Sequence, residues 1–129
     1  KVIPNPQTIA TAIKIGNPAS WKTALAARGE SGGVIDKVTD KEILEDYKIL
    51  AQKEGVFVEP ASAASVAGIL KLKKENYFEK LKKMNNRKKV LVCILTGHGL
   101  KDPAQAISSV KMPKAVPAKI ESILKVMGF

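Results

Sequence analysis

The sequence predicts an α/β fold: a partial, open, twisted and mainly parallel sheet with flanking helices. First, the apolar run Val90–Leu95 has the composition of a strand that is buried on both faces. Second, a polar, glycine-rich loop at 96–99 follows it, and a helix start follows the loop at Asp102–Pro103. Third, short predicted strands alternate with predicted helices along the chain. Because ligands bind at the carboxyl edge of such sheets, Thr96 and the loop after it are expected to face a small molecule.

The composition is that of a single domain. Of the 129 residues, 45% are hydrophobic and 5% are aromatic, so the core is expected to consist mainly of Ala, Val, Ile and Leu. No apolar run approaches the roughly 20 residues that cross a bilayer. The single cysteine, Cys93, can form no internal disulfide, which is typical of a reduced compartment. We expect a cytoplasmic protein without a membrane partner, and the lack of a methionine at Lys1 suggests a piece of something longer.

The net charge is +10, from 22 basic and 12 acidic residues, which would suit a small basic module that binds RNA. The basic residues cluster mainly between Lys71 and Lys89. Apolar residues recur there at helical spacing, so the lysines are expected to form the solvated face of a helix. Few aromatic side chains are available to stack on bases. Nucleic acid is therefore not the expected partner, although the basic module stays open as an alternative.

In the first half of the chain, residues 1–6 contain two prolines and are expected to be extended and irregular. Residues 8–16 could form a short helix or a strand. Asn17-Pro18 predicts a helix start, and this helix should end near Gly29. A short strand is predicted at 33–38.

The most distinctive helix signal begins at Thr39. Thr39 and Glu42 have the spacing of a capping box, and Gly55 is a typical end for the helix that follows. Val38 and Ile43 are spaced as a hydrophobic staple. One face of this helix is apolar and is expected to be buried: Ile43, Tyr47, Leu50 and Ala51.

The second half is expected to continue the alternation. Its predicted elements, in order, are a short strand at 56–59, a helix of small residues that Pro60 opens, a lysine-rich helix at 71–84, a turn at 85–87, the strand and loop described above, a helix from Pro103 and a last helix at about 118–127.

Several kinds of site are disfavoured by the residues present. One histidine and one cysteine cannot make a zinc site, and no metal is expected. Gly97-His98-Gly99 lacks the third glycine and the acid of a dinucleotide fingerprint. His98 is interpreted as a residue that forms hydrogen bonds within the loop. Glu59 ends a predicted strand before a helix, so it could serve a site or simply stabilise the helix start.

Three segments together resemble threonine synthases, which are pyridoxal-phosphate enzymes of the tryptophan synthase β-like family. They are TIATAIKIGNPASW at 8–21, EPASAAS at 59–65 and LTGHGLKDP at 95–103, and their order and spacing also match. Threonine dehydratases share the layout but typically have a Ser-Gly-Gly-Asn-type loop where this chain has Thr-Gly-His-Gly. A dehydratase-like enzyme therefore remains the second alternative.

The resemblance implies a fold, a cofactor and five site residues. Residues 1–129 would be the C-terminal portion of the large domain that binds pyridoxal 5'-phosphate, with about 113–129 a C-terminal extension helix. Thr96 would form a hydrogen bond with the pyridine nitrogen of the cofactor, because a hydroxyl can donate to an unprotonated nitrogen. Ala10 and Thr11 would lie beside the ring and the substrate. Glu59 and Ser62 would lie near the ring at the strand–helix junction.

The implied reaction converts O-phosphohomoserine and water to threonine and phosphate, through aldimine chemistry with γ-elimination and β-addition of water. This makes the parent protein a lyase of threonine biosynthesis. No catalytic residue is expected in this chain, because the family's Schiff-base lysine and phosphate-binding loop lie upstream. The chain alone is expected to be inactive without the missing N-terminal half, and the parent enzyme is expected to be a homo-oligomer, a dimer.

Overall fold

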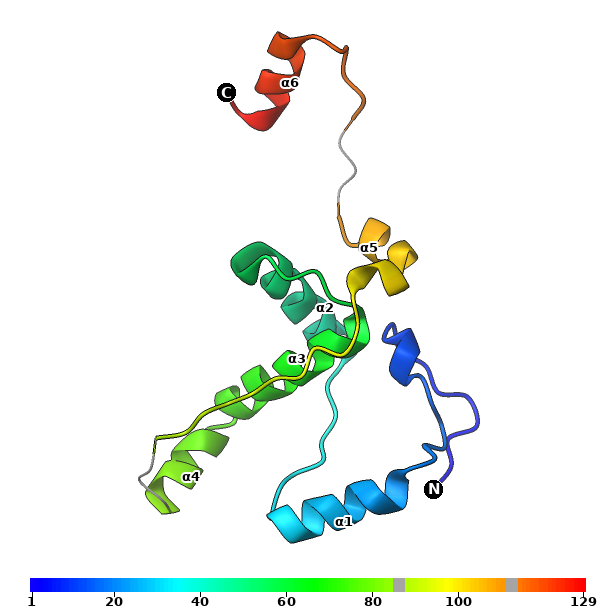
Figure 1. Cartoon of the computed structure of the whole chain (residues 1–129), viewed down its shortest axis with the longest axis vertical. Helices are drawn as coiled ribbons and strands as arrows, with labels where there is room; N and C mark the ends of the chain where they lie inside the picture. The colour runs from blue at the N-terminus through cyan, green and yellow to red at the C-terminus, as the bar shows by residue number, and fades with distance from the viewer. Residues whose placement is uncertain (85–87, 111–113) are drawn as a thin grey trace.

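The computed structural model describes residues 1–84, 88–110 and 114–129, and in them helices alternate with extended segments (Figure 1). The helices are α1 (Trp21–Ser31), α2 (Asp40–Ile49), α3 (Pro60–Lys74), α4 (Tyr77–Met84), α5 (Pro103–Ser108) and α6 (Ile120–Met127). Three shorter helical pieces complete them: η1 (Thr11–Ile13), η2 (Leu50–Glu54) and η3 (Gly99–Lys101). Among the described residues, no helix has the length and apolar composition needed to cross a membrane.

Helix α2 begins as predicted, with a complete capping box. The Thr39 hydroxyl accepts a hydrogen bond from the Glu42 backbone N–H at 3.2 Å, and the Glu42 carboxylate accepts one from the Thr39 N–H at 2.7 Å. The backbone N–H and the hydroxyl of Thr39 both donate to the Glu42 carboxylate, and these two hydrogen bonds lower the pKa of that carboxyl. The helix continues into η2 and ends at Gly55 in the left-handed conformation, at φ 67°. Local sequence therefore determines both ends of this element.

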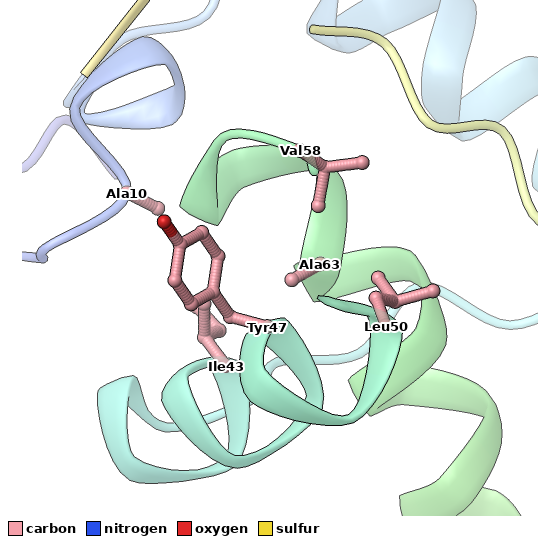
Figure 2. Close-up of a cluster of buried hydrophobic side chains, with 6 residues drawn as sticks. All are labelled: Ala10, Ile43, Tyr47, Leu50, Val58 and Ala63. Atoms are coloured by element: carbon pink, nitrogen blue, oxygen red, sulfur yellow. The ribbon is translucent and has the colours of Figure 1, made fainter. Parts of the chain in front are cut away.

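The core lies where α2 packs on the first turns of α3. The buried cluster joins residues from four parts of the chain (Figure 2): Ala10, Ile43, Tyr47, Leu50, Val58 and Ala63. Three of the four residues predicted for the apolar face of α2 belong to it, whereas Ala51 is exposed. Small side chains on α3 allow α2 to approach closely, and Ala63 is completely buried.

Asp46 is an acidic residue of α2 that is buried beside this core. Burial raises the pKa of its carboxyl, while the charge of Lys74 opposes the rise and the charges of Glu45 and Glu42 add to it. A raised pKa means that ionisation of Asp46 disfavours the folded state. Its cost is absent below the unfolded-state pKa of about 3.9 and develops as the pH rises through the folded-state pKa.

We therefore expect Asp46→Asn to increase the free energy of unfolding at neutral pH, and this gain should disappear as the pH falls below about 4. Urea unfolding at several pH values measures it. Glu54→Gln is the matched control, since Glu54 is exposed in η2 and is not among the charges that shift the Asp46 pKa. A gain of equal size at pH 3 and pH 7 would contradict the assignment to Asp46 ionisation.

The predicted parallel sheet is not confirmed. Within the described residues, the only β pairing is an isolated antiparallel bridge between Val58 and His98. Residues 33–38 and 88–95 are extended without strand partners, and the second segment runs along α3 (Figure 1). Val90 and Val92 are each 80% exposed, so this run is not buried on both faces. A strand requires hydrogen bonds to a neighbouring strand, and these segments have none here.

Other boundaries differ by a few residues. Helix α1 begins at Trp21 after Ser20 rather than at Asn17, and it ends at Gly32 in the left-handed conformation. Residues 8–16 contain only the turn η1. The lysine-rich helix is divided between α3 and α4, and Asn76 between them has a positive φ of 57°. The predicted turn at 85–87 lies outside the described residues, and α6 falls inside the predicted range of 118–127.

Candidate functional site

The site is built where the glycine loop crosses the start of α3. The backbone N–H of Glu59 donates to the Gly97 carbonyl at 3.0 Å, and the Gly99 N–H donates to the Phe57 carbonyl at 3.2 Å. The two segments can approach this closely because Gly97 and Gly99 have no side chains. A Cβ at Gly97 would overlap the Glu59 carboxylate, and one at Gly99 would overlap the Phe57 ring. The two segments thus run antiparallel with their backbones in contact, where a parallel arrangement was predicted.

Ser62, on the first turn of α3, connects the helix to the loop. Its hydroxyl accepts a hydrogen bond from the Gly97 N–H at 2.8 Å. The same oxygen lies 3.1 Å from the Thr96 hydroxyl and 3.3 Å from the Gly97 carbonyl. Ser62 is buried, whereas Thr96 is exposed. Ser62 therefore joins the start of α3 to the loop through the hydroxyl of the exposed Thr96 and through the Gly97 backbone.

For Glu59 the sequence left two interpretations open, a residue of the site or a carboxylate that stabilises the start of α3. It precedes α3, yet its side chain makes no capping hydrogen bond. Its carboxylate pairs instead with the Lys101 ammonium at 3.2 Å, and the two side chains are 5% and 59% exposed. The carboxylate is thus buried beside the loop, and its place in a cofactor site stays a prediction. No role was predicted for Lys101, and its position two residues after Gly99 is the one sequence signal that could have pointed to it.

Thr11 joins the N-terminal segment to the same place. Its hydroxyl donates to the Asp102 carboxylate at 3.1 Å, across 91 positions of sequence. Asp102 also accepts from the Gln105 N–H at 3.2 Å and so caps α5, as predicted. Ala10 is fully buried in the core cluster, so its side chain faces protein. The N-terminal segment therefore reaches the loop through Thr11.

His98 makes hydrogen bonds within the loop, as the sequence indicated. Its Nδ1 accepts from the Leu100 N–H at 3.2 Å, at the start of η3. The ring also lies edge-on to Phe57, with 5.4 Å between centroids. Both contacts hold the loop in place and make His98 a structural residue here.

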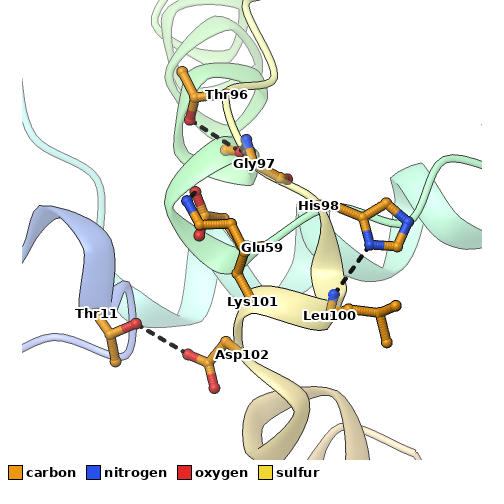
Figure 3. Close-up of polar contacts among 9 residues, drawn as sticks. Thr11, Glu59, Thr96, Gly97, His98, Leu100, Lys101 and Asp102 are labelled. Atoms are coloured by element: carbon orange, nitrogen blue, oxygen red, sulfur yellow. Dashed lines mark hydrogen bonds and ion pairs between the residues drawn. The ribbon is translucent and has the colours of Figure 1, made fainter.

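Figure 3 shows these groups gathered around one loop: Thr11, Glu59, Thr96, Lys101 and Asp102. Four of the five predicted site residues thus contribute polar groups to it, through Thr96, Ser62, Glu59 and Thr11. Ala10 lies beneath the site, among apolar neighbours. Their contact with a cofactor stays a prediction.

A family model described as "Pyridoxal-phosphate dependent enzyme" matches residues 1–97, which include Thr11, Glu59, Ser62 and Thr96. The chain belongs to the pyridoxal-phosphate dependent enzyme family. The cofactor predicted from the sequence is therefore confirmed for the family. The family has the tryptophan synthase β-like α/β fold, so the predicted α/β class agrees, although the residues that the structure describes form no sheet.

Several curated relatives of this chain carry the same name. The chain is 55% identical over 116 residues to "Threonine synthase" of Halalkalibacterium halodurans, which is 90% of the chain and 31% of that relative. It is 50% identical to the proteins of the same name in Synechocystis and Methanocaldococcus jannaschii, covering 98% and 95% of the chain. The predicted resemblance to threonine synthases is confirmed. The chain spans only 31%, 31% and 28% of the three relatives.

The described residues suit one end of pyridoxal phosphate. A pyridine nitrogen without a proton needs one neutral hydrogen-bond donor, and the exposed Thr96 hydroxyl is such a group. An aspartate there would instead favour a protonated ring nitrogen. The loop therefore fits the nitrogen end of the ring.

Proposed function

We propose that this chain is the C-terminal part of a threonine synthase, which converts O-phosphohomoserine and water to threonine and phosphate. The observation that carries the proposal is the exposed Thr96 hydroxyl at the Thr-Gly-His-Gly loop, supported by buried Ser62. The identity of 55% to a relative named "Threonine synthase" supports the choice of reaction. Residues 1–129 would then belong to the large cofactor-binding domain, and about 113–129 to a C-terminal extension.

When bound, pyridoxal phosphate supplies an electron sink that allows protons to leave carbon atoms of the substrate. The chain's own residues would orient the ring. Thr96 would donate its hydroxyl hydrogen to the ring nitrogen and so keep that nitrogen unprotonated. Thr11 would fix the N-terminal segment against Asp102, beside the ring. The Glu59–Lys101 pair would hold the loop over the start of α3 and present one ammonium group to solvent.

The remaining parts of the enzyme would come from sequence outside this chain, including the lysine that carries the cofactor and the phosphate-binding loop. Coverage of 31% of the first relative is consistent with this division. A cytoplasmic location and a dimeric assembly stay predictions. Membership of an enzyme family disfavours the basic RNA-binding module, and the Thr-Gly-His-Gly loop disfavours a threonine dehydratase.

The proposal is tested by phosphate release from O-phosphohomoserine in the presence of pyridoxal phosphate. The full polypeptide that carries this chain should release phosphate and form threonine, whereas the isolated chain should release none. Thr96→Val should lower kcat by at least about tenfold, because the ring nitrogen loses the hydroxyl that donates to it. Thr96→Ser keeps a hydroxyl and should retain most activity.

Threonine offered as the substrate provides the discriminating control. Release of ammonia from threonine at a higher kcat/KM than release of phosphate from O-phosphohomoserine would instead indicate the dehydratase alternative. Phosphate release by the isolated chain would contradict the expectation that essential groups lie outside it.

A further inference from the structure

Ser62, which is predicted to lie near the cofactor ring, is a buried residue of the site. Ser62 is 1% exposed, and its hydroxyl is enclosed by Thr96 and the Gly97 backbone. The neighbouring hydroxyl belongs to Thr96, which is an exposed residue. We propose that Ser62 is a positioning residue, which directs the hydroxyl hydrogen of Thr96 toward the ring nitrogen of pyridoxal phosphate. This inference rests on the proposed function.

The hydroxyl hydrogens of Ser62 and Thr96 can be arranged in two ways. The Ser62 oxygen accepts from the Gly97 N–H at 2.8 Å, and its single hydrogen has two possible acceptors. In one arrangement Ser62 donates to the Gly97 carbonyl at 3.3 Å, and Thr96 can then donate back to Ser62 at 3.1 Å. In the other arrangement Ser62 donates to Thr96. The Thr96 hydrogen is then free for an acceptor outside the protein.

The second arrangement is favoured when an acceptor lies in front of Thr96. The Gly97 carbonyl does not need the Ser62 hydrogen, because it already accepts from the Glu59 N–H at 3.0 Å. The chain of donors then runs from the Gly97 N–H to Ser62, to Thr96 and outward. Hydrogen bonds in such a chain polarise one another, so the Thr96 hydroxyl becomes a stronger donor. An acceptor with a free lone pair is selected, and a protonated ring nitrogen is disfavoured.

A double-mutant cycle in the full polypeptide separates this role from a structural one. The cycle uses Ser62→Ala, Thr96→Val and the double variant, each loaded with pyridoxal phosphate labelled with ¹⁵N in the ring. The ¹⁵N chemical shift reports hydrogen bonding at the ring nitrogen without requiring turnover. The apparent Kd for pyridoxal phosphate is measured alongside it.

Ser65→Ala is the matched control. Ser65 lies one turn further along α3, and its hydroxyl contacts backbone carbonyls of Ser62 and Ile94 at 2.9 and 3.3 Å. The control therefore removes a hydroxyl that links α3 to the same segment without touching Thr96. It should leave the ¹⁵N shift unchanged.

Ser62→Ala should move the ¹⁵N shift toward that of a pyridine nitrogen in water and weaken cofactor binding by about threefold to tenfold. In the Thr96→Val background the same substitution should leave the ¹⁵N shift unmoved, because no hydroxyl remains to be directed. An equal change in both backgrounds, or an equal change with Ser65→Ala, would overturn the positioning role. A wild-type polypeptide that binds no pyridoxal phosphate would overturn the proposed function itself, together with this inference.

Discussion

Replacing Tyr47 by alanine is expected to lower the free energy of unfolding by about 3–5 kcal/mol, the range for removing a buried aromatic ring. Tyr47 lies in the core cluster between Ala10 and Ile43 on one side and Val58 on the other (Figure 2). Its removal would leave a cavity where α2, α3 and the N-terminal segment meet. Neighbouring side chains are small or fixed in helices, so the cavity could close only in part.

The same substitution should also loosen the loop that carries Thr96. The Tyr47 ring lies edge-on to Phe57 at 6.4 Å, and Phe57 lies edge-on to His98 at 5.4 Å. Loss of Tyr47 would remove the inner support of this row of rings. Loading with pyridoxal phosphate should therefore fall together with stability.

Urea unfolding of the full polypeptide and its absorbance after loading with the cofactor measure both effects. Tyr47→Phe is the matched control, because it keeps the ring and removes only a hydroxyl. That control should cost less than about 1.5 kcal/mol, the upper range for one ordinary hydrogen bond. If Tyr47→Ala cost no more than Tyr47→Phe, the ring would not support the core as described.

Sequence alone predicts α2 well because its signals are local. The residues that begin the helix, Thr39 and Glu42, are three positions apart, and the capping hydrogen bonds join these two residues directly. The end at Gly55 needs only a residue that tolerates positive φ. The same applies to the start of α5, where Asp102 caps Gln105. Such contacts form whatever the rest of the protein does.

The sheet could not be predicted in this way, because strand pairing depends on partners far away in sequence. The run at 90–95 has the composition of a buried strand, yet burial requires neighbours on both faces. In the described residues it lies along one side of α3 with most side chains exposed. The composition of residues 90–95 is typical of a buried strand, but composition cannot show which neighbours the segment contacts.

The site falls between these cases. The sequence correctly singled out Ser62, Thr96 and Glu59 as residues of one region, although the hydroxyls of Ser62 and Thr96 are 34 positions apart. It could not show that Ser62 is buried beneath Thr96, or that Glu59 pairs with Lys101. Those relations depend on how the loop crosses α3, which follows from the close contact at Gly97.

That contact makes Gly97→Ala the second large expected effect. A Cβ at this position would overlap the Glu59 carboxylate, which is buried against the loop. The loop cannot easily move aside, because the Gly97 N–H donates to Ser62 and its carbonyl accepts from the Glu59 N–H. The carboxylate must shift instead and leave Lys101. We expect a loss of about 2–3 kcal/mol in stability, near the upper range for overpacking.

Cofactor loading should fall more steeply than stability, since the overlap lies next to Thr96. Gly29→Ala is the matched control, because a Cβ there meets no atom within 4 Å in exposed α1 and should be neutral or stabilising. Glu59→Ala tests the cause, since it removes the group that the new methyl would meet. In that background Gly97→Ala should cost clearly less stability and less cofactor binding. If its cost were unchanged, the close approach of the loop to Glu59 would not be what requires glycine at this position.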